Sequence, residues 1–225
     1  MMNIRTIISA VALLTVAILS SATAQTYTLG YDQTLYTTTV GSTVDVQLVL
    51  TEQIAGSEVA RLAVGGNDGL FAFSADTDFS VFTGGATGSI FNGTVIINPA
   101  FAGVLLDSGQ AVTTGPGNVS LEGNEGTSDS GDGEIGVTGV MVSPTEYQLV
   151  LATLQFDAGD VGSLTTLELG DHVNPLAPPF VFGEGATPDI GFVNSQILVT
   201  AIPEPGSLAF ITLIAGAGLL QRRRK

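Results

Sequence analysis

The chain of 225 residues has no cysteine, no tryptophan and a single histidine, His172. Without cysteine, no disulfide can hold the fold together, and neither a thiolate nucleophile nor a thiolate zinc ligand is available. The histidine lies in a proline-rich segment, and no serine stands in the Gly-x-Ser-x-Gly pattern of a nucleophile elbow. We therefore interpret His172 as a surface residue and predict no catalytic residue and no cofactor.

Basic residues are almost as scarce. Between Gln25 and Ile202, Arg61 is the only lysine or arginine, against 20 acidic residues, so this segment has a formal charge of −19. Such a charge repels phosphate backbones, which excludes nucleic acid as a partner. Because only one cation is available, few salt bridges can form, and the carboxylates must face water or bind metal ions.

Three short acidic segments are candidates for calcium binding, because hard cations prefer clustered oxygen ligands. They are residues 67–69, 76–78 and 129–134, the last of which reads D-S-G-D-G-E. None has the spacing of an EF-hand loop. We interpret all three as solvated loops and predict no metal site, but leave open whether residues 129–134 bind calcium.

The first 24 residues have the three parts of a secretory signal peptide. Arg5 supplies a positive charge, residues 7–19 form an apolar run, and Ala22-Thr23-Ala24 is the small-x-small pattern that precedes a cleavage site. The sequence therefore predicts export, with Gln25 as the first residue of the mature chain. The body that follows, Gln25–Ile202, has 178 residues, which is the size of one domain.

The last 23 residues, 203–225, form a second targeting segment. The motif Pro203-Glu204-Pro205 breaks any strand, and residues 206–220 are apolar or small except for one threonine. A basic cluster follows, made of Arg222, Arg223, Arg224 and Lys225. This order predicts a helix that enters the membrane with its basic end held in the cytoplasm. At 15 residues it would be about 22 Å long, against a hydrocarbon core of about 30 Å, so we expect a transient anchor.

These three parts, in this order and on a chain with a signal peptide, resemble the PEP-CTERM sorting signal. The resemblance implies recognition by an exosortase and cleavage near Pro203-Glu204-Pro205. It also implies export through the inner membrane of a Gram-negative bacterium that makes extracellular polysaccharide. On this basis we expect the protein at the cell surface or outside the cell, with a membrane-anchored precursor.

The body predicts an all-β fold, because short apolar runs are separated by Gly- and Thr-rich turns. Thr43–Thr51 has the period of two that marks a half-buried strand. The other predicted strands are 59–64, two strands within 71–82 joined by a tight link around Asp76 and Asp78, 89–98, 135–142, 147–156, 164–169 and 192–200. Residues 115–136 and 171–188 are predicted as surface loops. These elements predict a single antiparallel β-sandwich of the jelly-roll type, with no helix of its own.

Two segments of the body resemble cohesin-like and related carbohydrate-binding-type sandwiches. Val40–Val46 is similar to the opening strand of that group, and Leu151–Leu169 looks like its late strand pair. The resemblance implies a sandwich fold and makes a cohesin-type protein-binding module one alternative for the function.

The leading hypothesis for the function is a non-enzymatic surface or extracellular-matrix protein that associates with polysaccharide or with another exported protein. A second alternative is a carbohydrate-active enzyme, because two of the acidic residues could lie the roughly 5–9 Å apart that glycoside hydrolysis needs. The absence of tryptophan argues against that enzyme, since sugar-processing sites usually carry aromatic platforms.

Overall fold

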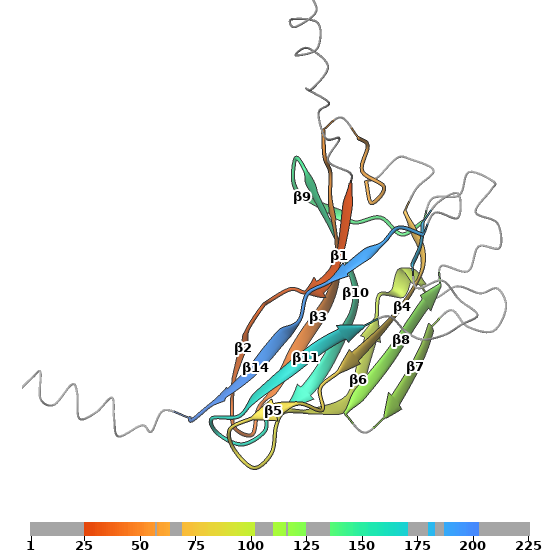
Figure 1. Cartoon of the computed structure of the whole chain (residues 1–225). Helices are drawn as coiled ribbons and strands as arrows, with labels where there is room; N and C mark the ends of the chain where they lie inside the picture. The colour runs from red at the N-terminus through yellow and green to blue at the C-terminus, as the bar shows by residue number, and fades with distance from the viewer. Residues whose placement is uncertain are drawn as a thin grey trace, which may run out of the picture.

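The computed structural model describes residues 25–56, 58–63, 69–101, 110–115, 117–124, 136–170, 180–182 and 187–202. Within these ranges, the strands form two sheets that pack face to face (Figure 1). The one helical element among the described residues is a short 3-10 turn, η1 (Pro99–Phe101). The predicted all-β fold is therefore confirmed.

The first sheet has the strand order β13-β1-β3-β10-β6, and β9 pairs with β10 along the same edge as β6. Its strands are β1 (Thr26–Tyr31), β3 (Thr43–Gln53), β6 (Ile90–Ile97), β9 (Val140–Ser143), β10 (Glu146–Asp157) and β13 (Ile190–Phe192). Neighbouring strands are antiparallel except for β1 and β13, which run parallel.

The second sheet has the order β2-β14-β11-β4-β8-β7, with β12 beside β4 and β5 beside β11. Its strands are β2 (Tyr36–Thr39), β4 (Leu70–Asp78), β5 (Phe82–Thr83), β7 (Gln110–Gly115), β8 (Asn118–Asn124), β11 (Leu164–Gly170), β12 (Phe180–Phe182) and β14 (Ser195–Thr200). Here β2 and β14 are the parallel pair.

The first two strands and the last two strands of the body form two segments that pass from one sheet to the other, side by side. β1 continues into β2, and β13 continues into β14, so both segments leave the first sheet for the second (Figure 1). At the crossing, the N–H of Val193 donates to the carbonyl of Leu29 at 2.9 Å, and Ser195 Oγ donates to the carbonyl of Gln33 at 2.7 Å. Because the two segments run in the same direction, they pair in parallel. This corrects the wholly antiparallel sandwich that the sequence predicted.

The core lies between the inner faces of the two sheets. Val46, Leu48 and Leu50 of β3 have no exposed surface, as the period of two predicted. Near one end of the core, the ring of Phe156 meets Phe79 edge-on, with centroids 5.2 Å apart. Residues of both sheets belong to one buried cluster, in which each large apolar side chain contributes about 1.5–3 kcal/mol.

The strongest strand predictions are confirmed, and others shift at their ends. Residues 43–51, 89–98, 147–156 and 164–169 correspond to β3, β6, β10 and β11. The strand predicted over 135–142 begins only at Val140, and the one over 192–200 is interrupted at Val193, where the chain changes sheet. Asp76 and Asp78 lie inside β4 rather than in a link, because Thr77 between them is buried against the core.

Three of the predictions assigned the wrong kind of structure, one predicted strand and two predicted loops. The described part of the predicted strand 59–64 forms turns, because the N–H groups of Arg61 and Leu62 donate to the Glu52 carboxylate instead of to a neighbouring strand. The two predicted loops also contain strands. β8 lies within 115–136, and β12 lies within 171–188 and pairs with β4.

Several predicted features lie outside the described residues. They are the signal peptide 1–24 with Ala22 and Ala24, the tail 203–225, His172, and the acidic segment 129–134. In the ranges that the structure does describe, no helix combines the length and the hydropathy needed to cross a bilayer.

Candidate functional site

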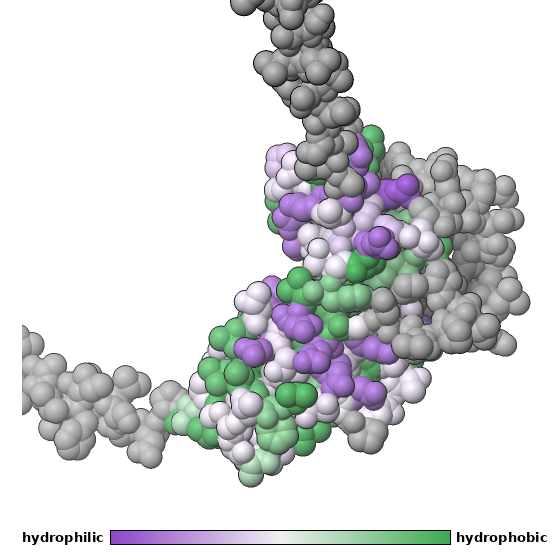
Figure 2. All heavy atoms as spheres, in the orientation of Figure 1, coloured by the Kyte–Doolittle hydropathy of each residue, from purple (hydrophilic) through white to green (hydrophobic). Residues whose placement is uncertain are grey.

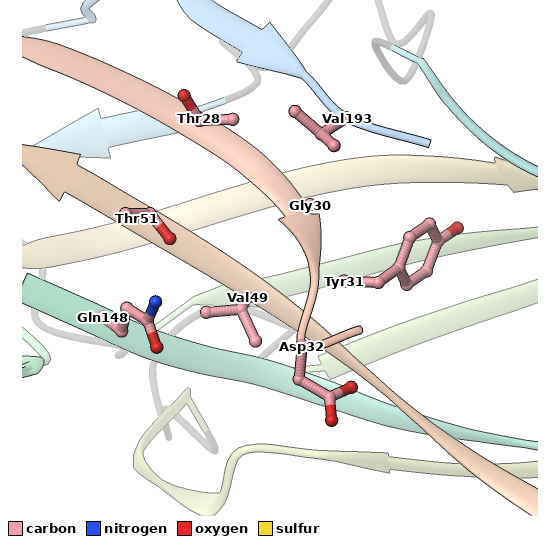
Figure 3. A pocket seen from close by; sticks show the side chains of 8 residues that line it. All are labelled: Thr28, Gly30, Tyr31, Asp32, Val49, Thr51, Gln148 and Val193. Carbon is pink, nitrogen blue, oxygen red and sulfur yellow. The ribbon is translucent and has the colours of Figure 1, made fainter. Parts of the chain in front are cut away.

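A hollow of about 310 Å³ lies on the outer face of the first sheet (Figure 3). Strand pairing builds it: Thr28 of β1 lies opposite Thr51 of β3, which lies opposite Gln148 of β10. The next outward pair along β1 and β3 is Gly30 and Val49. The lining residues are Thr28, Gly30, Tyr31, Asp32, Val49, Thr51, Gln148 and Val193.

Gly30 and Val193 give the hollow its depth. Val193 belongs to the crossing between β13 and β14, and a Cβ atom built on Gly30 would lie 3.4 Å from the Cβ of Val193. A larger side chain at position 30 would therefore press on Val193 and fill the space. Val49 faces outward from its strand yet is only 6% exposed, so it forms an apolar floor.

The polar groups of the hollow are mostly neutral. The structure shows no hydrogen bond from the hydroxyls of Thr28 or Thr51 to other described residues, so both are available to a ligand. Gln148 Nε2 donates to Glu146 Oε1 at 2.9 Å, which fixes the side-chain amide of Gln148. Together these groups offer hydrogen-bond donors and acceptors above an apolar floor.

Asp32 contributes the one carboxylate among the lining residues. Its Oδ1 accepts hydrogen bonds from the N–H of Gln47 at 3.1 Å and from the hydroxyl of Tyr36. Its Oδ2 accepts only a long hydrogen bond of 3.4 Å from Gln33 Nε2 and can accept another. Burial, and then the neighbouring Asp32 carboxylate, raises the pKa of Tyr36 above its usual range, so Tyr36 stays protonated and donates.

Tyr31 lines the hollow without offering it a reactive group. Figure 3 shows its ring pointing away from the other lining side chains. Burial in the core raises the pKa of Tyr31 above its usual range, against a smaller lowering by Thr77. The phenol therefore stays neutral at physiological pH and takes no part in acid–base chemistry at the surface.

The hollow can bind, but it lacks the groups for hydrolysis. Glycoside hydrolysis needs two carboxylates across the scissile bond, and Asp32 is the one carboxylate that lines this hollow. Among the described residues, no group of three or more His, Cys, Asp or Glu side chains is arranged to hold a metal ion. The arrangement fits recognition of a ligand that carries hydroxyl groups and apolar C–H surfaces.

The outer face of the second sheet is different in chemistry. Four carboxylates project from it, because the residues on either side of each face the core: Asp76, Asp78, Glu122 and Glu168. Asp78 lies directly opposite Glu168 across β4 and β11, an unfavourable pair of like charges. None of these four residues lines the hollow on the first sheet. Asp76–Asp78, a predicted calcium candidate, is therefore part of an open strand face.

Glu52 is a buried carboxylate with a structural role. It has no exposed surface, and it accepts hydrogen bonds from the N–H groups of Arg61 and Leu62, both at 2.7 Å, and from Tyr27 Oη at 3.1 Å. Gln25, the predicted first residue of the mature chain, also donates to it through its side-chain amide. These partners satisfy the carboxylate, so we assign it no catalytic function.

Sequence reasoning did not find the residues of the hollow, although β1 carried a signal. Tyr27, Leu29 and Tyr31 alternate, which is typical of a strand, and Gly30 within such a pattern indicates close approach of another segment. No sequence signal placed Val193 over Gly30, because that contact depends on the crossing of two segments far apart in the chain.

No protein-family model matches the chain, and no curated protein matches it either. Among solved structures it is similar to the seventh ScaB type I cohesin from Pseudobacteroides cellulosolvens, with 16% identity, 80% of this chain and 96% of that chain covered, and a TM-score of 0.46. It is also similar to a type II cohesin domain from the cellulosome of Acetivibrio cellulolyticus, with 15% identity and a TM-score of 0.41. The match covers 76% of this chain and 95% of that chain.

A third similar structure is BcpA, the major pilin subunit of Bacillus cereus, with 9% identity, 79% of this chain and 41% of that chain covered, and a TM-score of 0.32. At these identities and TM-scores the likenesses carry no functional inference. The function has to be inferred from the surfaces of the chain itself.

Proposed function

We propose that this chain is an exported, non-catalytic binding protein of the cell surface or extracellular matrix, whose hollow on the first sheet binds a neutral polysaccharide. Residues 1–24 direct export, and residues 203–225 act as a PEP-CTERM sorting signal that an exosortase recognises and cleaves. The body then associates with exopolysaccharide in the biofilm matrix.

The chemistry of the hollow carries this proposal. A sugar ring presents hydroxyl groups around its edge and C–H groups on its faces. The hydroxyl groups of the sugar can form hydrogen bonds with Thr28, Thr51 and Gln148. Its C–H faces can pack against Val49. The formal charge of −19 on the body favours a neutral polysaccharide over an anionic one.

Calorimetric titration of the full chain with a neutral hexasaccharide and with an acidic, uronate-containing one tests the proposal. We expect binding of the neutral ligand, and Thr51→Val should weaken it about five-fold, which corresponds to one lost hydrogen bond. Thr166→Val, on the outer face of the other sheet, is the matched control and should leave the affinity unchanged. Binding that both variants weaken equally, or no binding of either ligand, would contradict the proposal.

A second candidate is a cohesin-type protein-binding module, which the acidic outer face of the second sheet favours. Asp76, Asp78, Glu122 and Glu168 would complement a basic surface on another exported protein. A lysine-rich peptide should then bind the full chain at low salt, and Glu168→Gln together with Asp78→Asn should weaken this binding. If the double variant binds as tightly as the wild type, the acidic face is not the binding surface.

The sorting tail has its own test. Mass spectrometry of secreted material should find chains that begin at Gln25 and end near Pro203. Deletion of the exosortase should leave full-length chains in the membrane. If the secreted chains keep residues 206–225, the tail is not processed.

A further inference from the structure

One end of the sandwich exposes several large apolar side chains close to the point where the tail begins. It is the end at which the described chain finishes, after β14 (Figure 1). The turn between β2 and β3 lies beside it, because the N–H of Val40 donates to the carbonyl of Thr200 at 3.2 Å. The turn between β10 and β11 lies there too, because the N–H of Gly162 donates to the carbonyl of Val199 at 2.8 Å.

The link between β4 and β6 completes this end. Asp160 Oδ2 accepts hydrogen bonds from the N–H groups of Ala86 at 2.9 Å and Thr87 at 2.7 Å. The ring of Phe82 lies so close to Gly88 that a Cβ atom there would be 2.6 Å from it. The four segments, 38–42, 80–90, 158–163 and 198–202, therefore form one continuous surface, which we call the C-terminal end.

Large apolar side chains are exposed over the C-terminal end. The exposed fractions are 37% for Val40, 53% for Val81, 40% for Phe82, 56% for Ile90, 49% for Val161 and 61% for Ile202. Figure 2 shows hydrophobic residues over the part of the body where the described chain finishes. A contiguous apolar surface of this kind marks a site of contact with a protein or a membrane.

The four segments of the C-terminal end contain a single ionisable side chain, Asp160, and one of its carboxylate oxygens accepts two backbone N–H groups. Two further carboxylates border this surface: Asp157 lies opposite Ile90, and Asp78 accepts a hydrogen bond from the N–H of Ser80 at 2.8 Å. The opposite end also exposes apolar residues, on β9, with Glu58 and Glu146 in the segments around them. Charge therefore does not separate the two ends, but the tail follows directly from the C-terminal end, at Ile202.

The end also has an apolar hollow of about 230 Å³, lined in part by Phe79, Phe82 and Ile90. Ser89 also lines this hollow, but its hydroxyl is buried beneath the surface, so the hollow offers an occupant mainly apolar contacts.

We propose that the C-terminal end rests on the lipid surface of the membrane while the tail is inserted. This inference rests on the proposed membrane insertion of residues 206–220. Only Pro203-Glu204-Pro205 separates Ile202 from that apolar run. Four extended residue steps reach at most about 14 Å, so the end cannot move far from the interfacial region, which is several ångströms thick on each side of the hydrocarbon core.

Single-cysteine labelling tests the proposal cleanly, because the chain has no cysteine of its own. The chain Gln25–Lys225 is reconstituted in phosphatidylcholine vesicles that contain nitroxide-labelled lipids. An environment-sensitive fluorophore is attached in turn to Val161→Cys and Val81→Cys at the C-terminal end, Val140→Cys at the opposite end, and Leu213→Cys in the tail. We expect lipid quenching of about two-fold or more at positions 81, 161 and 213 and none at 140.

The outcomes separate the two claims. Quenching at 213 without quenching at 81 and 161 overturns the contact but keeps the inserted tail. Quenching at 81 and 161 without 213 supports the contact and contradicts the inserted tail, and no quenching at any position overturns both. Equal quenching at position 140, or energy transfer between labelled chains at position 161, also overturns the proposal, because it indicates non-specific adsorption or a second copy on this surface.

Discussion

At each end of the sandwich, one carboxylate accepts hydrogen bonds from two backbone N–H groups of a neighbouring segment, but the two carboxylates differ in burial. At the end where the body begins, Glu52 accepts the N–H groups of Arg61 and Leu62 and holds the segment 58–63 in turns. At the end where it finishes, Asp160 accepts the N–H groups of Ala86 and Thr87. Glu52 has no exposed surface, whereas Asp160 is partly exposed.

The difference shows how a chain with one Arg and 20 acids between Gln25 and Ile202 uses its carboxylates. With so few side-chain cations available, backbone N–H groups serve as partners of both Glu52 and Asp160. A third carboxylate, Asp32, repeats the pattern midway along the first sheet, with the N–H of Gln47 and the hydroxyl of Tyr36. Burial decides what each contact contributes, because water can replace a lost carboxylate only where it has access.

The largest effect is expected from Glu52→Ala. The change removes the buried carboxylate that accepts hydrogen bonds from two backbone N–H groups and the Tyr27 hydroxyl, at a cost of about 3–5 kcal/mol in the free energy of unfolding. Urea denaturation followed by circular dichroism measures it. Glu52→Gln, which keeps one acceptor oxygen, is the matched control and should lose less; equal losses would show that hydrogen bonding to the carboxylate is not the cause.

Sequence patterns predicted the parts of the fold that depend on local alternation. β3, β10 and β11 were found because apolar and polar residues alternate over part of each strand. β7 and β8 were missed because glycine, asparagine, serine and threonine are frequent in them, although Val119 and Leu121 alternate in the core. The turn held by Glu52 was missed because Val59–Val64 has strand-like composition, and composition cannot show a competing side-chain acceptor.

The candidate hollow could not be predicted, for a different reason. Its residues come from β1, β3, β10 and the crossing before β14, and only the register of the sheet brings Thr28, Thr51 and Gln148 together. The parallel pairing of β1 with β13 adds Val193, which follows β13 directly. Register and long-range pairing are set by the packing of the whole sandwich, and no short window of sequence carries them.

A second effect, a loss of stability at alkaline pH, is expected from Tyr36, whose hydroxyl donates to the Asp32 carboxylate between the two ends. Burial, followed by Asp32, raises the pKa of Tyr36 in the folded state above its unfolded value of 10.0. The stability that this neutral phenol contributes is complete below pH 10 and decreases as the pH rises above it, because only the unfolded chain then releases the proton. Urea denaturation between pH 8 and 11 should show this decrease, and Tyr36→Phe should reduce it to the part that Tyr31, whose pKa is also raised, contributes. An equal slope in both proteins would rule out Tyr36 as the source.

Asp160→Ala should have a smaller effect than Glu52→Ala. It removes the acceptor of Ala86 and Thr87, but water reaches this end of the sandwich, so we expect a loss of about 1–2 kcal/mol. Thermal denaturation followed by circular dichroism measures it, with Asp189→Ala, an exposed acid, as the control. If Asp160→Ala costs as much as Glu52→Ala, depth of burial does not explain the difference between the ends.

The smallest effect concerns the start of the mature chain. The backbone nitrogen of Gln25 lies 3.3 Å from Glu58 Oε2, and cleavage after Ala24 would turn that nitrogen into an ammonium group. An exposed ion pair of this kind contributes less than about 1 kcal/mol and weakens in high salt. In a chain that begins at Gln25, Glu58→Gln should therefore lower the melting temperature slightly at low salt and not at about 1 M salt.

N-terminal acetylation supplies the control for that variant, because it removes the ammonium charge and leaves the backbone in place. In the acetylated chain, Glu58→Gln should have no measurable effect, since an amide N–H offers Glu58 only an exposed, long hydrogen bond. An equal effect with and without acetylation would mean that Glu58 acts through its other neighbours. The charge of the new N-terminus would then play no part in stabilising this end.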